Sequence, residues 1–281
     1  MSGPARLLIV DPTRLSDGAI VTASTYSGEM LPGNVQDKRL DYVWQSTGDS
    51  SEWLKFNFGA AESINCICFH AGNLTQDATI KVEASANDSS WTTILDTTSI
   101  FTSIYGFGEG GFGEHGFGGS YLAEESGDWE PVIFYEWPDA NYRYWRVTFV
   151  DAANPDTWLE IPRLAFDNFL AFGDIQWPRV KINDPSATSY TIGAAPRSAK
   201  ATKFWTVDFT FGWLEESAVY ADAVPFVDRV GTTEDFYLLL DESEWRQPHA
   251  DRQRWYGRLT SPLDYLAAII APIPFSFRQT R

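Results

Sequence analysis

The sequence has few of the residues from which catalytic and metal centres are most often built. It contains two cysteines and three histidines in 281 residues. His70, His115 and His249 lie far apart in the chain. Cys66 and Cys68 form a lone C-x-C with no His or Cys cluster nearby, which is too little for a zinc site. No G-x-S-x-G, H-E-x-x-H or P-loop sequence is present. We therefore expect a protein that is not an enzyme.

Basic residues and long apolar runs are also scarce. The chain has 21 Lys and Arg against 38 Asp and Glu, a formal net charge of −17. A chain this acidic is repelled by phosphate backbones and by anionic lipid surfaces, so we expect no nucleic acid partner. No apolar stretch is long enough for a membrane span, and the N-terminal apolar run is too short for a signal peptide. We expect a protein made in the cytoplasm of its host cell, without membrane insertion.

Apolar and aromatic residues, by contrast, are plentiful. The hydrophobic fraction is 44% and the aromatic fraction 15%, which is enough for packed cores and argues against disorder. Twelve tryptophans invite a role at interfaces, where one edge of the ring is buried and the other meets a partner. The length of the chain favours two domains.

The clearest strand is Asn141–Val150, where Trp145, Val147 and Phe149 alternate with polar and aromatic residues. Trp53–Phe58 follows the same pattern, with Leu54, Phe56 and Phe58 on one face. Successive side chains of a strand point to opposite sides of the sheet, so one face of each strand should pack into a core. Cys66 and Cys68 would point the same way in a strand, which is poor geometry for a mutual disulfide, so we expect two reduced, buried thiols.

These patterns predict a mainly β protein with a boundary near residue 173. Residues 1–172 should form a β-sandwich, with a first strand near residues 5–10 and a Pro138–Asn141 turn before the Trp145 strand. A Gly-rich insertion at 102–128 should carry Phe107, Phe112 and Phe117 as anchors for a neighbouring protein. Its G-x-G-x-x-G lacks the strand and helix that a phosphate-binding loop needs.

Residues 173–281 should form a smaller α+β domain. Residues 203–211 alternate as a strand does, and Leu214–Val230 has apolar residues at helical spacing. Pro225 predicts a kink or break in that helix, and Gly231 stands where a C-terminal cap is expected. Strands are predicted near Phe236–Leu240 and toward the C-terminus.

An ordered series of segments in the N-terminal half resembles the discoidin-like, galactose-binding-like sandwich of coagulation factor C-type domains and many carbohydrate-binding modules. The segments are Asn34-x-x-Asp37, Val43–Ser46, Glu52–Gly59, Ile64–Phe69, Ile80–Ser85, Arg143–Phe149 and Glu160–Phe166. The resemblance implies an eight-stranded jelly roll with ligand loops at one end, and in many members a structural calcium. Carried over, Asp37 and Glu160 would be calcium ligands; the alternative is that Asp37 caps a turn and Glu160 is a solvated edge residue.

The tryptophans near predicted loops are candidates for contact with a glycan, because an exposed ring can stack on a sugar face. Trp129 and Trp158 are the best candidates, since their neighbours are polar. Trp44 and Trp53 stand where the resembled family buries core aromatics.

The C-terminal half is similar to domains attached to tail components of long-tailed bacteriophages, on the segments FWTVDFTF, GTTEDFYLLLD and FSFRQTR. That resemblance implies a virion structural protein of a tail tip or baseplate, assembled as a homo-oligomeric ring and bound to other tail proteins. The sandwich would brace the assembly or contact host surface glycans. The alternative is a stand-alone, lectin-like carbohydrate-binding module without catalysis.

Overall fold

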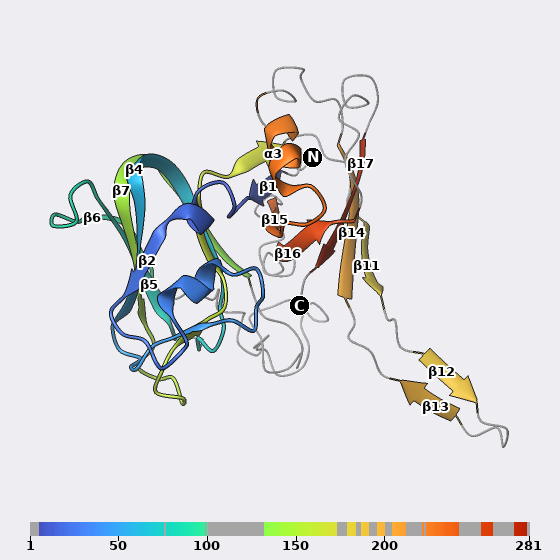
Figure 1. The fold of residues 1–281 in the computed structure, drawn as a ribbon, viewed down its shortest axis with the longest axis horizontal. Helices are drawn as coiled ribbons and strands as arrows, with labels where there is room; N and C mark the ends of the chain where they lie inside the picture. The colour runs from blue at the N-terminus through green and yellow to red at the C-terminus, as the bar shows by residue number, and fades with distance from the viewer. Residues whose placement is uncertain are drawn as a thin grey trace, which may run out of the picture. The chain divides into compact units, whose positions relative to one another are not determined.

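A computed structural model describes residues 6–75, 77–98, 100, 132–172, 179–183, 187–190, 196–199, 204–211, 221, 223–241, 254–260 and 273–279. These residues are mainly β, with one short α-helix among them (Figure 1). The chain divides into two compact units. One, the sandwich unit, contains Val10–Phe169; the other, the seven-stranded unit, joins the chain up to Ile9 with Leu170–Ser243 and Trp255–Arg281.

Two strands of 19 residues form the frame of the sandwich unit. β4 (Glu52–His70) and β7 (Val132–Val150) pair antiparallel along their whole length. In the first half of β4 the strand order is β2-β4-β7-β5-β6, with β2 at Ile20–Ala23, β5 at Thr79–Ser85 and β6 at Thr92–Asp96. In the second half, β4 also pairs with β9 (Leu164–Asp167). A separate pair joins β3 (Trp44–Gln45) to β8 (Glu160–Ile161).

β4 and β7 are longer than the strands Trp53–Phe58 and Asn141–Val150 that the sequence predicted. The expected turn at residues 138–141 is wrong, because the pairing of β7 with β4 continues past it. The register shifts between Asn57 and Glu62, and such bulges bend a strand pair without ending it. Gly59 supplies the left-handed backbone, φ 79°, that the bend needs, and its N–H donates to Asn57 Oδ1 at 3.0 Å.

The predicted core face is confirmed. Trp145, Val147 and Phe149 of β7 are fully buried, as are Leu54 and Phe56 of β4. The rings of Phe56 and Trp145 both pack against Phe166 of β9, the first edge-on and the second tilted. The sandwich is therefore held together by the period-two pattern of its two longest strands.

The closing segment of the sandwich unit is interrupted at Pro162 and Arg163, which separate β8 from β9. Pro162 has no N–H to donate to a ladder, so the strand breaks there. Arg163 is buried and donates Nη2 to Asp17 Oδ2 at 2.8 Å and Nη1 to the Val35 carbonyl at 3.2 Å.

The seven-stranded unit has the strand order β10-β1-β15-β16-β17-β14-β11. Its helix α3 (Val224–Val230) begins with Pro225 in the first turn and ends at Gly231, φ 51°, whose N–H donates to the Val227 carbonyl at 2.8 Å. The predicted cap is confirmed; the earlier part of the predicted helix lies largely outside the described residues. The strands are β1 (Arg6–Val10), β10 (Leu170–Phe172), β11 (Arg179–Asn183), β12 (Ala187–Tyr190), β13 (Pro196–Ala199), β14 (Phe204–Phe211), β15 (Phe236–Asp241), β16 (Arg254–Leu259) and β17 (Ile273–Gln279).

The predicted boundary at residue 173 assigns the start of the chain to the wrong domain. We expected β1 in the first domain, 1–172, but it pairs with β10 through Ile9↔Leu170 and Leu7↔Phe172 and belongs to the second sheet. Within the part of the chain that the structure describes, no helix is long and apolar enough to cross a membrane.

Candidate functional site at the loop end of the sandwich

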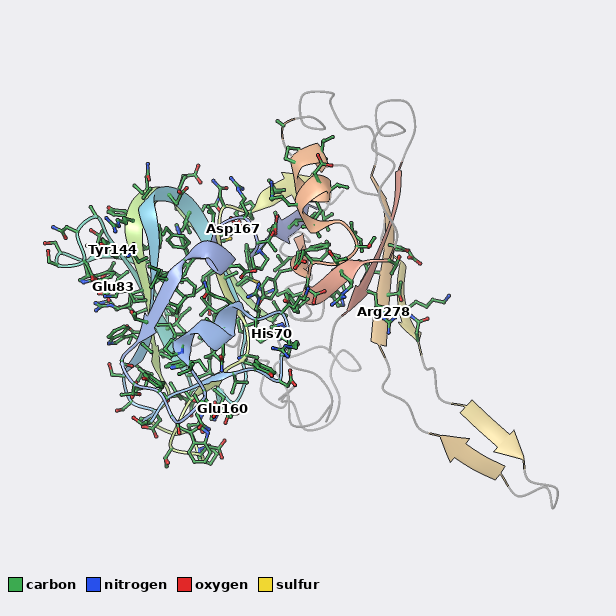
Figure 2. The ribbon with its side chains drawn as sticks, viewed as in Figure 1. His70, Glu83, Tyr144, Glu160, Asp167 and Arg278 are labelled. Carbon is green, nitrogen blue, oxygen red and sulfur yellow. The ribbon has the colours of Figure 1, made fainter. Side chains whose placement is uncertain are left out.

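The candidate site is built where three loops meet around the β3-β8 pair. Gln45 of β3 lies opposite Glu160 of β8. The loops are residues 24–43 before β3, residues 71–78 between β4 and β5, and residues 151–159 before β8. Figure 2 labels Glu160 at this end of the sandwich unit. We call Gln45, Asn73, Asp156, Trp158 and Glu160 the loop site.

A buried polar network fixes the start of the 151–159 loop. Asp151 is buried and its Oδ2 accepts the Thr75 N–H at 2.7 Å. Asn154, also buried, donates Nδ2 to the Asn73 carbonyl at 2.9 Å and to Asp151 Oδ2 at 3.1 Å. Its Oδ1 accepts the Asp156 N–H at 3.0 Å. Buried polar groups that all find partners hold a loop in one conformation.

Asn73 then fixes the part of the loop that carries the site. Its Nδ2 donates to Asp156 Oδ2 at 3.1 Å and to the Trp158 carbonyl at 3.0 Å. Its Oδ1 accepts the Glu160 N–H at 2.7 Å. One amide side chain therefore holds three alternate residues of the loop, and no N–H of that amide is left for a ligand.

The backbone of the site is unusual at two positions. Thr157 has φ 62°, a left-handed conformation that is costly for a β-branched residue. Gly72 has φ 58°, and a Cβ built on it would lie 1.8 Å from the Glu160 carbonyl oxygen. The 71–78 loop thus passes so close to β8 that only glycine fits there.

Trp158 is the exposed ring of the site, with 37% of its surface accessible. Its Nε1–H donates to Glu160 Oε1 at 3.0 Å, and the same oxygen accepts Gln45 Nε2 at 2.7 Å. Among the described residues no hydrogen bond reaches Glu160 Oε2. The site therefore presents a ring in a fixed position beside a free carboxylate oxygen.

The 24–43 loop adds exposed apolar side chains near the same strand pair. Gln45 donates its N–H to the Met30 carbonyl at 3.4 Å and accepts the Ser27 N–H at 2.9 Å. This loop is thereby tied to β3. It contributes four of the large apolar residues that are exposed in the described part of the chain: Tyr26, Met30, Leu31 and Tyr42.

The tryptophans named from sequence have different positions. Trp158 is exposed and lies in the loop site, and its contact with a glycan stays a prediction, whereas Trp129 lies outside the described residues. Trp44 is fully buried, and its Nε1 donates to the Thr25 carbonyl at 3.0 Å. Trp53 is half-buried on β4. The loop anchors Phe107, Phe112 and Phe117 also lie outside the described residues.

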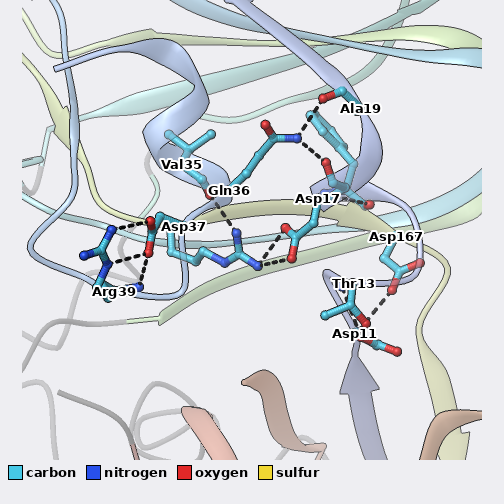
Figure 3. Close-up of polar contacts among 12 residues, drawn as sticks. Asp11, Thr13, Asp17, Ala19, Val35, Gln36, Asp37, Arg39 and Asp167 are labelled. Carbon is cyan, nitrogen blue, oxygen red and sulfur yellow. Dashed lines mark hydrogen bonds and ion pairs between the residues drawn. The ribbon is translucent and has the colours of Figure 1, made fainter. Parts of the chain in front are cut away.

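The expected calcium ligands do not fit a calcium ion. Asp37 accepts Arg39 Nε at 3.0 Å and Nη2 at 2.8 Å, and these hydrogen bonds lower the pKa of Asp37 to about 2 (Figure 3). Glu160 is held instead by Trp158 and Gln45. A guanidinium already occupies the carboxylate that calcium would need, and calcium requires about six to eight oxygens. Within the described ranges, no group of three or more His, Cys, Asp or Glu is arranged to hold a metal.

The remaining titratable candidates are parts of the core. Cys66 and Cys68 are free, buried thiols, as predicted, and burial raises the pKa of both. His70 ends β4, and burial lowers its pKa to about 3, so the ring is neutral at ordinary pH. A group of this kind is not accessible for acid–base chemistry.

The sequence did not reveal Asn73, Gln45 or the apolar residues of the 24–43 loop. Asn73 and Glu160 are 87 residues apart, and their hydrogen bond has no local signal.

Comparison with known proteins gave structural likeness only. No family model matches the chain, and no curated protein matches its sequence. Among solved structures, the chain is similar to the CBM32 of AlyQ in complex with 4,5-unsaturated mannuronic acid, at 22% identity and a TM-score of 0.38, covering 56% of this chain and 96% of that one. It is similar to CpGH89CBM32-5 from Clostridium perfringens, in complex with GalNAc-beta-1,3-galactose, at 11% identity and a TM-score of 0.39, covering 55% and 99%.

A third similar structure is chitosan-binding module 1 of a chitosanase/glucanase from Paenibacillus sp. IK-5, at 16% identity and a TM-score of 0.39, covering 54% and 96%. None of these findings supports the expected resemblance of residues 173–281 to phage tail components, which stays a prediction. The case for a function therefore depends on the loop site itself.

Proposed function

We propose that the sandwich unit is a carbohydrate-binding module that binds a glycan at the loop site and breaks no bond. The observation that carries this proposal is the exposed Trp158 ring, whose N–H is tied to Glu160 on a loop that buried hydrogen bonds hold in place. The apolar face of a sugar stacks on an aromatic ring, and its hydroxyls pair with polar side chains at the edge of the ring.

The rigidity of the loop supports binding rather than packing as the role of Trp158. A left-handed Thr157 costs of the order of 1–3 kcal/mol, and such conformations cluster at ligand sites. A ring fixed before the ligand arrives loses little conformational freedom on binding, which raises affinity. Glu160 Oε2 is available to accept a sugar hydroxyl at the same place.

The test is glycan-array screening of the full chain, followed by calorimetric titration with the best ligand. Trp158→Ala should weaken binding by tenfold or more, a loss of about 1.4 kcal/mol or above. Trp91→Ala is the matched control, because Trp91 is a half-buried ring stacked by Arg146 at 4.2 Å on another part of the sandwich. A blank array, or equal affinity for wild type and Trp158→Ala, would exclude the proposal. Mass spectrometry of the recovered glycan tests the absence of catalysis.

The role in a phage tail tip, with location in the virion and binding to other tail proteins, remains a separate prediction. Its direct test is to locate the gene in a phage genome and to search purified virions of that phage for the chain by mass spectrometry.

A further inference from the structure

The side chains of the loop site donate most of their hydrogen bonds to one another. Asn73 donates both of its N–H groups, one to Asp156 Oδ2 and one to the Trp158 carbonyl. The Trp158 Nε1–H and an N–H of Gln45 both go to Glu160 Oε1. The second N–H of Gln45 is the one side-chain N–H of the loop site that makes no hydrogen bond to a described residue. The site therefore has little to offer a ligand that needs donors.

Acceptors remain at the same place. Glu160 Oε2 and Asp156 Oδ1 accept no hydrogen bond from the residues that the structure describes, and the two carboxylates flank Trp158 in the chain. Asn73 ties them together, because its Oδ1 accepts the Glu160 N–H at 2.7 Å while its Nδ2 donates to Asp156 Oδ2 at 3.1 Å. A ligand stacked on Trp158 thus meets carboxylate oxygens whose lone pairs are available.

The loops around the site carry the same sign of charge. Together with Glu160, the three loops contain seven Asp and Glu residues against two basic residues, Lys38 and Arg39. Arg39 is already held, since its Nε and Nη2 donate to Asp37 at 3.0 and 2.8 Å. A carboxylate or sulfate group on a ligand would be repelled here, whereas an ammonium group would be attracted.

We infer that the glycan bound at the loop site carries free amino groups, with an ammonium of the sugar against Glu160 Oε2 and the sugar face on Trp158. An ammonium has three donors and no acceptor, which matches a site whose remaining groups are mainly acceptors. A charge-assisted hydrogen bond is about twice as strong as a neutral one, so a hydroxyl or an acetamido group in the same place gains less. The inference rests on the proposed function, since it names the class of glycan that the same site binds.

A glycan array tests it with the full chain. The array presents gluco-, galacto- and manno-configured oligosaccharides, each with an amino, acetamido or hydroxyl group at C2, together with the matching uronic acids. The amino form of the best ligand should bind about tenfold tighter than its acetamido and hydroxyl forms, and the uronic acids should not bind. Equal or tighter binding of any of these other forms would overturn the inference and leave glycan binding itself intact, whereas a blank array would exclude the proposed function as well.

Glu160→Gln is the variant that isolates the free oxygen. Its amide oxygen still accepts the Trp158 N–H, but an NH₂ group takes the place of Oε2 and offers the ammonium no acceptor. The variant should bind the hydroxyl form as wild type does and lose the tenfold preference for the amino form. Glu62→Gln makes the same change in net charge on the half-buried bend of β4 and should keep the preference. A preference unchanged in Glu160→Gln would contradict the inference, and thermal unfolding checks that both variants are folded.

A lysine oligomer separates a sugar site from general attraction of cations to an acidic chain. At equal charge and concentration it should not displace the amino glycan from wild type, because it has no sugar face to stack on Trp158. Displacement as effective as that by the unlabelled glycan would show that charge alone accounts for binding, and would overturn the inference.

Discussion

Glu160 Oε1 accepts the indole N–H of Trp158, two residues earlier in the chain, at 3.0 Å. The same oxygen accepts the Gln45 amide from the neighbouring strand at 2.7 Å. One carboxylate oxygen therefore sets the position of the exposed ring, while the other stays available to a ligand. Glu160 should be a binding residue as well as a positioning one.

We expect Glu160→Ala to weaken binding of the array-selected glycan by tenfold or more. The substitution removes the acceptor from two N–H groups and leaves the ring free to move. Glu160→Gln should weaken it less, because the amide oxygen still accepts the Trp158 N–H. Calorimetric titration measures both, and Glu62→Ala, a half-buried carboxylate at the bend of β4, is the control. Equal affinities for the Ala and Gln variants would show that the hydrogen bond to the ring does not matter.

Gly72→Ala should destabilise the sandwich unit by about 2–4 kcal/mol, since it combines a left-handed φ with a Cβ 1.8 Å from the Glu160 carbonyl oxygen. Two controls separate the causes. Gly59 has φ 79° with no atom within 4 Å of a built Cβ, so Gly59→Ala should cost about 1 kcal/mol from the backbone alone. Gly33 has open space and no positive φ, so Gly33→Ala should be close to neutral. Thermal unfolding measures all three, and a Gly72→Ala no worse than Gly59→Ala would contradict the close approach.

Chelation should leave stability unchanged. Asp37 is paired with Arg39, and Glu160 keeps only Oε2 free, so these two residues supply too few oxygens for a calcium ion. Melting curves with EDTA and with added calcium should coincide, and an upward shift with calcium would reveal a site that these two residues do not explain.

The local elements of this fold are readable from sequence because their patterns are local. The alternation through Trp145, Val147 and Phe149 predicts a buried face, and these side chains are fully buried. Pro162 has no N–H to donate to a ladder, and β8 ends just before it. In each case a few neighbouring residues carry the whole signal.

The long-range pairing is not readable in this way. The expected turn at residues 138–141 is absent because bulges let β4 and β7 bend together, and no local motif distinguishes a bend from a turn. β1 joins β10, more than 150 residues away in the chain, as the pair Ile9↔Leu170 shows. An apolar strand fits either sheet, so composition does not decide between them.

In the loop site, too, local features can be predicted from sequence and long-range contacts cannot. Polar neighbours singled out Trp158 as an exposed ring, and it is exposed. Asn73 and Gln45, which hold the ring and Glu160, come from other loops and strands, and no spacing in the sequence connects them with Trp158.

Cys66 and Cys68 should be unreactive in the folded protein. Both are fully buried, and burial raises the pKa of each thiol, which lowers the fraction of thiolate. Cys66 Sγ also donates to the Asp167 carbonyl at 3.2 Å. Alkylation followed by mass spectrometry should label neither thiol in native buffer and both in denaturant. Fast labelling of the native protein would mean that this part of the sandwich opens readily.

Asp167 and His70 should give opposite contributions to stability between about pH 4 and pH 7. Burial, with a smaller contribution from the Asp11 carboxylate, raises the pKa of Asp167 to about 7, and Asp167 Oδ2 accepts the Asp11 N–H at 3.1 Å (Figure 3). Between about pH 4 and pH 7 the folded state then holds a proton that the unfolded state has lost. The contribution of Asp167 to the free energy of unfolding therefore falls by about 4 kcal/mol as the pH rises through this range.

His70 acts the other way, because burial lowers its pKa to about 3. Below about pH 6.5 the unfolded state binds a proton that the folded state does not. The contribution of His70 to the free energy of unfolding is therefore lost as the pH falls from about 6.5 toward 3. Wild type should therefore show a shallow pH profile in which the two slopes largely cancel. Asp167→Asn should leave only the rise with pH, and His70→Gln only the fall. Urea unfolding at a series of pH values measures the three profiles; parallel profiles for wild type and Asp167→Asn would mean that Asp167 is ionised in the folded state.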